Sequence, residues 1–488
     1  MRMFRRASTV FSLITAAPAL AQALPAPAAD ATPIDRLEPA FGAAEVSLPA
    51  PNGNAVIDRL NALEARVSAL AAHSKDLEAQ LELAQGRIAA TEVRAAKGVQ
   101  AGVSPLLADS NGNFSFKARG VVDADFVAFK GQRGGYAYNS GTGFRRARLG
   151  VEGTAFKDFN WRLEVDFAGN SVAIQDAYLQ YNGFKPLTIT LGQFKMPFGL
   201  ESNNSDNYNS FLERGMFTNA IGAVGGERRL GAALALVRDT YTLTASVSGD
   251  NESVFRSAGA TPISAQPESW GINARATWEP VSAPGRIVHL GASGFWRTTV
   301  KSGDTANAIR LTERPNVRVD GSNIIDTGVI PNVENLYYFG LEGAAVHGPF
   351  SLAAEYGKLR VDRSVGFTDP SFEGYYVYGS WFVTGESRSF QSGNFNRLRP
   401  LADFDSKGGS GAVELLLRYD DFRAGKTPVI ARAGSYANSI TGAVNWYLTP
   451  NFKLQLNYIA FKGVNTPLDP IGDRTTGSAL ATRLHIDW

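Results

Sequence analysis

Apolar and polar residues alternate in many short segments from Asn113 to the C-terminus. In "WRLEVDF" (161–167), the tryptophan, leucine, valine and phenylalanine fall on one face and the three charged residues fall on the other. "NFKLQLNY" (451–458) and the C-terminal "LATRLHIDW" (480–488) follow the same pattern. A period of two predicts β-strands whose faces meet different surroundings. Apolar material lies on one side of these strands, and water lies on the other.

About sixteen such segments, separated by short turns and long polar loops, are typical of an outer-membrane β-barrel. We therefore predict an all-β transmembrane barrel of about 16 antiparallel strands. A soluble β-sandwich is the alternative, but it would not normally follow a secretion signal with so many strands and one strand face this charged. Beyond the N-terminal leader, no apolar run is long enough for a membrane-spanning helix.

The lengths of the connections predict which end of the barrel faces which compartment. If Trp488 lies at the periplasmic rim, the turns "KDFN", "RDT", "HGP" and "TPN" lie there too, and the long segments 197–227, 250–268 and 300–334 lie outside. Five tryptophans then fall near the periplasmic rim, namely Trp161, Trp278, Trp381, Trp446 and Trp488. The connection 384–408 is long yet periplasmic, so we expect it to fold back into the lumen.

The N-terminus predicts export. Arg2, Arg5 and Arg6 precede an apolar stretch, and small residues then allow cleavage after Ala21 or Ala23. We assign 1–23 to a signal peptide, with a mitochondrial presequence as the alternative, and 24–54 to an Ala/Pro-rich linker. The predicted location is the bacterial outer membrane, with lipid and lipopolysaccharide as surroundings.

Residues 55–97 show a heptad repeat. The d positions are Val56, Leu63, Leu70, Leu77, Ala84 and Thr91, and the a positions are Leu60, Val67, Ser74, Leu81, Ile88 and Ala95. Basic residues occupy g and glutamates occupy e, which favours a parallel coiled coil between copies of the chain, in the periplasm. The alternative is one amphipathic helix lying on another surface. A linker, 98–112, separates this segment from the barrel domain, 113–488.

Several motifs carry a family resemblance. "FRRARLGVEGTAFKDFNWRLEVDFAGNSVAIQDAYLQY", "LGQFKMPFGLES", "FLERGMFTNAIGAVGGERRLG" and "AVNWYLTPNFKLQLNY" resemble the phosphate-selective porin O/P family over most of 114–488. The resemblance implies a homotrimeric sixteen-stranded outer-membrane porin. It also implies that the third outer loop, 197–227, folds inward to narrow the channel, and that arginines and lysines line the pore.

The pore-lining and anion-contact candidates lie in these motifs and in the segment 384–408. They are Arg146, Arg148, Lys195, Arg214, Arg229, Arg388, Arg397 and Arg399. Arg145 has lipid-facing parity, so we expect it at the outer rim, reaching headgroups or a loop. Acidic residues share the predicted lumenal face, namely Glu152, Glu164, Asp166, Asp176 and Glu414. They weigh against strong phosphate selectivity.

The predicted function is passive diffusion of small solutes through a water-filled channel that prefers anions such as phosphate. A porin for neutral or sugar-like solutes and a structural or adhesive barrel tethered through its coiled coil are the alternatives. We predict no enzyme activity, no catalytic residues, no metal and no cofactor, because the chain has no cysteine and its barrel histidines have no recognisable catalytic partners. The near balance of 48 basic and 46 acidic residues gives no reason to expect nucleic acid as a partner.

Overall fold

The computed structural model places most of the barrel domain and part of the N-terminal helix. It describes residues 54, 57–58, 60–75, 77–78, 99–100, 104, 106–133, 138–250, 268–298, 301–302, 305–427, 429–430, 433–467 and 474–488. The chain divides into two units, Met1–Leu83 and Ala84–Trp488. Within the described ranges, no helix is both long and apolar enough to cross a membrane.

The first unit contains a helix whose apolar residues are uncovered. Residues 60–75 are helical, and the predicted seam residues Leu63, Val67 and Leu70 are 58%, 63% and 67% exposed. A helix with an apolar stripe normally buries that stripe against another element. The predicted signal peptide and the predicted heptads beyond residue 78 lie outside the described residues.

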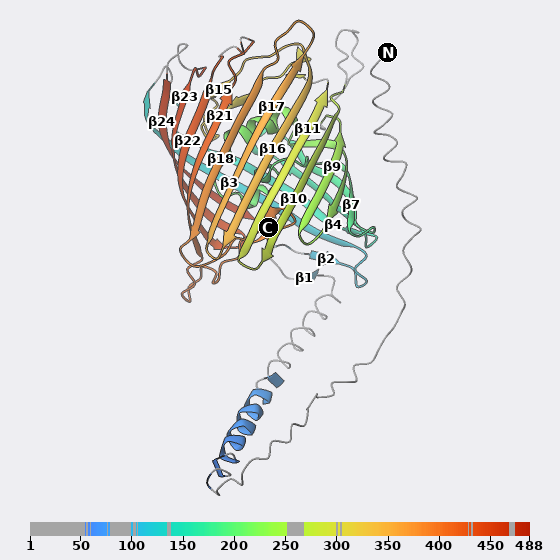
Figure 1. The fold of residues 1–488 in the computed structure, drawn as a ribbon, viewed down its shortest axis with the longest axis vertical. Helices are drawn as coiled ribbons and strands as arrows, with labels where there is room; N and C mark the ends of the chain where they lie inside the picture. Colours follow the sequence, from blue (N-terminus) through green and yellow to red (C-terminus); the bar gives the residue numbers. More distant parts are fainter. Residues whose placement is uncertain are drawn as a thin grey trace, which may run out of the picture. The chain divides into compact units, whose positions relative to one another are not determined.

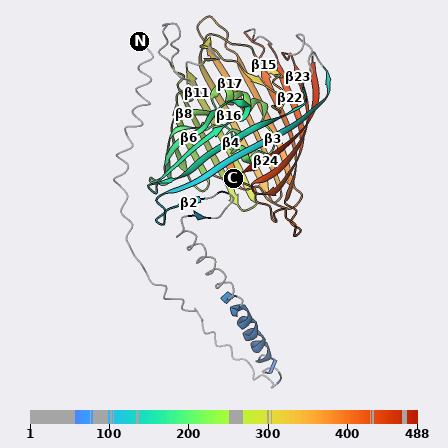
Figure 2. The ribbon, with the colours of Figure 1, turned by 180° about the vertical axis from the view of Figure 1, so that it is seen from behind.

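The second unit is a closed barrel of sixteen antiparallel strands (Figures 1 and 2). The strands are β3 (Ser115–Arg133), β4 (Gly141–Ala155), β5 (Phe159–Asp166), β6 (Ala173–Tyr181), β7 (Leu187–Lys195), β8 (Arg228–Val237), β9 (Tyr241–Ser248), β10 (Gly271–Ala283), β11 (Arg286–Thr298), β16 (Val333–His347), β17 (Phe350–Arg363), β18 (Ser371–Phe382), β21 (Ala412–Ala424), β22 (Tyr436–Thr449), β23 (Phe452–Val464) and β24 (Arg474–Asp487). Each strand pairs with its neighbour in the chain, and β24 pairs with β3 to close the ring. The predicted fold class is confirmed.

Short accessory strands flank the barrel or lie in its loops. They are β1 (Val99–Gln100), β2 (Leu106–Ala108), β12 (Lys301–Ser302), β13 (Thr305–Ala306), β14 (Thr312–Glu313), β15 (Ile325–Asp326), β19 (Phe390–Gln391) and β20 (Asn394–Phe395). β2 pairs with the first residues of β3, and the last three pairs each form a small hairpin.

The alternation predicts correctly which side chains point inward. On β23, Leu456 and Tyr458 are 41% and 54% exposed, whereas Gln455 and Asn457 are buried. Because the exposed residues are apolar and the buried ones are polar, the outer surface suits lipid and the interior holds the polar groups.

The two ends of the barrel differ as the turn lengths predict. At the rim that holds Trp488, most connections have five residues or fewer; they are 156–158, 182–186, 238–240, 284–285, 348–349 and 450–451. The opposite end, called here the distal rim, carries the long connections. Three connecting segments are named the inner loop (196–227), the cap loop (305–332) and the insert (384–408).

The barrel seam depends on a glycine at the Trp488 rim. Gly120 of β3 exchanges two backbone hydrogen bonds with Trp488, at 3.1 and 3.2 Å, and a Cβ at this position would overlap the indole ring. Gly120→Val is therefore expected to destabilise the closed barrel by about 1–3 kcal/mol through overpacking. The measurement is the temperature at which the folded band on a semi-native gel is lost. Gly442→Val is the matched control because a Cβ there meets open space; an equal loss in both variants would contradict the prediction.

Candidate functional site

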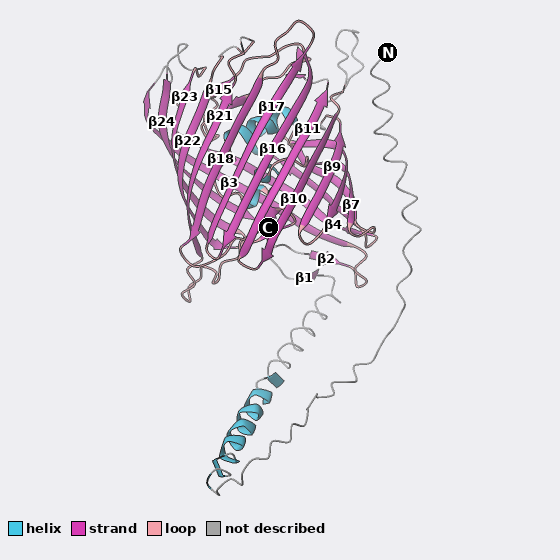
Figure 3. Cartoon of the chain, in the orientation of Figure 1, coloured by secondary structure: helices cyan, strands magenta, loops and turns pink. Residues whose placement is uncertain are grey.

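The inner loop enters the lumen from the distal rim and folds into three short helical segments. They are α3 (Leu200–Asn203), η3 (Asp206–Tyr208) and α4 (Met216–Gly225). Figure 3 shows these helices inside the ring of strands. The expected inward folding of 197–227 is confirmed.

Carboxylates from the wall hold the starts of two of these helices. Glu355 of β17 accepts hydrogen bonds from the backbone N–H of Leu200 at 2.5 Å and of Glu201 at 2.9 Å. Asp420 of β21 accepts from the N–H of Met216 at 2.9 Å. The first N–H groups of a helix have no partner within it, so these acids satisfy donors that would otherwise be buried and unpaired.

Cations of the wall hold carbonyl groups of the same loop. Arg418 donates from Nη1 to the Glu213 carbonyl at 2.8 Å, and Arg483 donates from Nη1 to the Leu212 carbonyl at 2.5 Å. Lys453 donates to two further carbonyls of the loop at 3.0 and 3.1 Å. The inner loop is therefore bound to the wall at β17, β21, β23 and β24.

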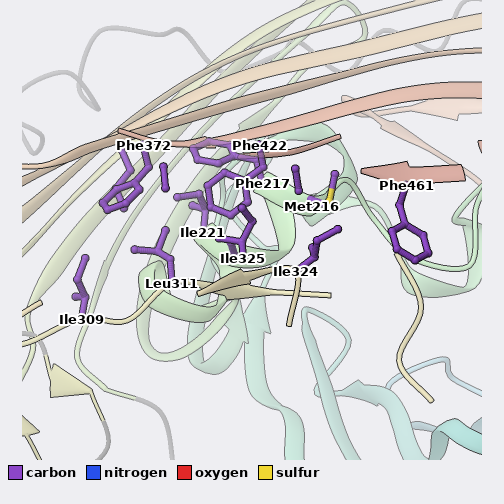
Figure 4. Packing of buried hydrophobic residues seen from close by; sticks show 14 of the residues in the cluster. Met216, Phe217, Ile221, Ile309, Leu311, Ile324, Ile325, Phe372, Phe422 and Phe461 are labelled. Carbon is purple, nitrogen blue, oxygen red and sulfur yellow. The ribbon is translucent and has the colours of Figure 1, made fainter. Parts of the chain in front are cut away.

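An apolar cluster joins the distal face of α4 to the cap loop (Figure 4). Met216, Phe217 and Ile221 of α4 are buried together with Leu311 and Ile325 of the cap loop. Phe372 and Phe422 complete the cluster from the wall. The predicted outer segment 300–334 thus does lie at the distal end, but from residue 308 onward it packs into the barrel mouth against the inner loop.

Within the cap loop, Glu313 is buried and faces Arg318 at 2.7 Å, with Glu213 and Arg314 nearby. Burial raises the pKa of Glu313 to about 7, and Arg318 opposes that rise only in part. Because the folded pKa lies above the ordinary value, the packed loop binds the proton more tightly than the open loop. Its stability is greatest in acid and falls as pH rises through about 7.

We therefore expect proteolysis of the cap loop to speed up between about pH 5 and pH 8, as closure loses about 3 kcal/mol. Glu313→Gln imitates the protonated side chain and is expected to remove this dependence. Cleavage rates of both proteins compared at each pH measure the effect. Equal pH profiles for the two proteins would count against it.

A cluster of charges, the Asp206 cluster, lies between the inner loop and the wall. Asp206 of η3 is 7% exposed. Five cationic side chains lie within 4.0 Å of its carboxylate, namely Arg148 at 2.8 Å, Lys195 at 3.4 Å, Arg146 at 3.5 Å, Arg228 at 4.0 Å and Arg214. One loop carboxylate is thus shared by cations of β4, β7, β8 and the loop itself.

Each of the five cations also has a second acid. The pairs are Arg146–Asp123 at 2.7 Å, Arg148–Asp166 at 2.8 Å, Lys195–Glu227 at 3.6 Å, Arg214–Glu227 at 2.9 Å and Arg228–Asp176 at 3.0 Å. Buried charges persist when they are paired and hydrogen-bonded. The predicted lumenal acids are therefore present and satisfy the arginines beside them.

Two cavities adjoin this cluster and differ in which charges face the open space. The first, about 330 Å³, is lined by five cations (Arg119, Arg148, Arg162, Lys195 and Arg228) and three acids (Glu164, Asp176 and Asp206). The second, about 520 Å³ and nearer the distal rim, is lined by four cations (Arg145, Arg214, Arg314 and Arg318) and three acids (Asp125, Glu227 and Glu313). Both linings have more cations than carboxylates.

The insert enters the lumen from the Trp488 rim, as predicted. Arg388 donates to Glu414 at 2.9 Å and is buried, and Arg397 donates to Asp487 at 2.9 Å. The N–H of Phe395 donates at 3.0 Å to the side-chain oxygen of Asn204 in the inner loop. The two segments therefore meet inside the barrel, while residues 401–408 of the insert stay exposed.

The eight candidate residues fall into two groups. Arg146, Arg148, Lys195 and Arg214 meet around Asp206. The other four lie apart from that cluster. Arg229 pairs with Asp250 at 3.1 Å, Arg388 and Arg397 anchor the insert, and Arg399 is exposed.

Three residues of the site were not found from the sequence, and one was placed differently. Asp206 and Glu227 lie in a loop without periodicity, so no pattern gave their direction. Arg228 gave no separate signal beside Arg229, the neighbouring candidate.

Arg145 occupies an irregularity in the β3–β4 register, which breaks the parity, and its guanidinium donates to Glu213 of the inner loop at 2.7 and 3.1 Å. Headgroups and a loop were the two contacts expected for Arg145, and the structure shows the contact with the loop.

The barrel domain is similar to a known protein family and to individual bacterial proteins. The family model described as phosphate-selective porin O and P matches residues 116–488. An uncharacterized protein of Caulobacter vibrioides is 30% identical over 387 residues, which cover 78% of this chain and 75% of that protein. Porin O of Pseudomonas aeruginosa is 27% identical over 398 residues, which cover 73% of this chain and 85% of that protein. Among solved structures, OmpT of Vibrio cholerae gives a TM-score of 0.48 at 9% identity, covering 77% of this chain and 98% of its own.

Proposed function

This chain belongs to the phosphate-selective porin O and P family, and it is an outer-membrane porin; we propose that its channel prefers small anions and that the Asp206 cluster sets this preference. The observation that supports this preference is the excess of cations among the side chains that line both cavities. An ion that enters either cavity meets this excess, because Asp123 and Asp166, which pair with Arg146 and Arg148, are not among the lining residues. Cations that line a pore favour anions.

The guanidinium groups suit oxyanions such as phosphate or a carboxylate. Arginine offers a planar fork of donors that matches two oxygens at once. Here Arg148 and Arg228 already bind carboxylates, so an entering anion exchanges partners and does not fill an empty site. Such exchange keeps binding weak enough for release, which a conducting pore requires.

A porin adds no bond chemistry to this process. The lumen replaces the hydrocarbon barrier with water and fixed dipoles, so a charged solute avoids a desolvation cost of at least several kcal/mol. We infer no enzymatic step, in keeping with the family.

The assembly we propose is a homotrimer in the outer membrane. The exposed apolar stripe of helix 60–75 supports self-association, because three parallel helices would cover one another's seams. We further propose that residues 1–23 are removed on export, that the coiled coil lies in the periplasm, and that lipid and lipopolysaccharide surround the apolar wall.

Planar-bilayer recording of the purified protein tests the channel proposal. We expect discrete conductance steps in chloride that diminish when inorganic phosphate is added, because phosphate competes for the same arginines. Steps unaffected by phosphate would keep the porin and remove phosphate as a solute that binds. A barrel without steps would favour the structural alternative, since the inner loop and the insert both occupy the lumen.

A further inference from the structure

One histidine lies where the wall meets the insert. His289 of β11 is 0% exposed, and its ring centre lies 4.8 Å from that of Phe390 in the insert. Phe390 in turn packs against Phe395, which bonds to the inner loop. His289 is therefore a wall residue beneath one of the contacts that hold the insert in the lumen.

Both ring nitrogens of His289 face carboxylates. Nε2 lies 2.8 Å from Oε1 of Glu342 on β16, and Nδ1 lies 3.4 Å from Oε1 of Glu279 on β10. An imidazolium donates from both nitrogens, whereas a neutral ring must turn one lone pair toward a carboxylate. Each ring nitrogen therefore has a carboxylate as a possible acceptor, and only a doubly protonated ring could donate to both.

The acids around the ring have few other cationic partners. Glu342 also binds Arg275 of β10, and Glu355 of β17 lies near Glu342. For Glu279, His289 is the one ion-pair partner within the described part of the chain. Without the ring proton, Glu279 and Glu342 have one cationic partner between them among the described residues, namely Arg275, which binds Glu342.

His485 provides an internal contrast. Its ring also lies between two carboxylates, Asp123 at 2.6 Å and Asp487 at 3.5 Å. There, however, Arg146 and Arg397 already pair with those acids, and Lys453 lies opposite on β23. This second site is balanced without a charged histidine.

We propose that His289 is a positioning residue whose protonated ring holds the insert inside the channel, and that loss of the ring proton to solvent releases the insert. Arg275 links the charge to the backbone, because the guanidinium that binds Glu342 also donates to the carbonyl of Gly393 at 2.7 Å. A buried carboxylate without a cationic partner is stabilised by water, which reaches the site once the Phe390 ring leaves.

The absence of cysteine from the chain allows a direct test. Ser387 has a buried hydroxyl in the insert, and Ser406 lies in its exposed part, so Ser387→Cys reports insertion and Ser406→Cys serves as reference. Histidine changes charge between about pH 5 and pH 8. Across that range we expect the labelling rate at position 387, relative to 406, to rise about tenfold as the ring loses its proton.

Two further variants isolate the cause. His289→Gln and Glu279→Gln are each expected to abolish the pH dependence, the second with the insert kept inside, whereas His485→Gln is expected to keep it. Folding of each variant is checked on a semi-native gel, so that Glu279→Gln still decides the matter if His289→Gln does not fold. A rate ratio that does not change with pH in the wild type, or one that changes equally in Glu279→Gln, would overturn the proposal. Labelling does not depend on conduction, so the result is separate from the ion preference proposed above.

Discussion

Asp206→Asn is expected to raise the anion-over-cation permeability ratio about tenfold, which corresponds to about 1.4 kcal/mol. The substitution removes one negative charge from the centre of five cations and keeps the size of the side chain. Two unit charges 4 Å apart interact by about 4 kcal/mol near a protein surface, so a fraction of that interaction is enough.

The barrel is expected to tolerate this change, because each of the five cations retains a second carboxylate. Arg146 keeps Asp123 and Arg228 keeps Asp176, for example. The reversal potential in a salt gradient gives the ratio. Asp369→Asn is the matched control, since Asp369 is exposed and pairs with an exposed arginine at the distal rim. A folded Asp206→Asn protein with the wild-type ratio would show that the Asp206 cluster does not set the selectivity.

Removal of residues 387–398 is expected to raise the single-channel conductance several-fold. This part of the insert reaches the inner loop through Phe395 and fills the lumen from the Trp488 rim. The deletion also removes Arg388 and Arg397, so Glu414→Gln and Asp487→Asn must accompany it to avoid leaving buried acids unpaired.

The control for this deletion carries Glu414→Gln and Asp487→Asn with the insert intact. Conductance steps of the two proteins, recorded in the same salt, separate the loss of the obstruction from the loss of charge. If both proteins conduct alike, the insert does not limit the flow of ions.

The barrel could be predicted from the sequence because a strand that separates lipid from water must alternate. In β4 (Gly141–Ala155), the inward direction of Arg146 and Arg148 follows from the alternation with Ala147 and Leu149, which face outward. The inward path of 384–408 followed from its length at the end with short turns.

The other features of the site depended on contacts that leave no periodic pattern in the sequence. Asp206 lies in a loop whose path is set by Glu355, Asp420 and Arg418, which are distant in the chain. Arg145 turns inward because of one irregular residue in the β3–β4 ladder, and such an irregularity is invisible in the alternation. Charge reversal at Arg145 is therefore expected to disturb Glu213 and the inner loop.

The reversal potential of the wild-type channel tests the central claim most directly. Purified protein is inserted into a planar bilayer between two concentrations of potassium chloride, and the potential at zero current is read. The account predicts the sign that corresponds to preferential flow of chloride, because cations outnumber carboxylates in both cavity linings. A potential of the opposite sign, corresponding to preferential flow of potassium, would contradict it.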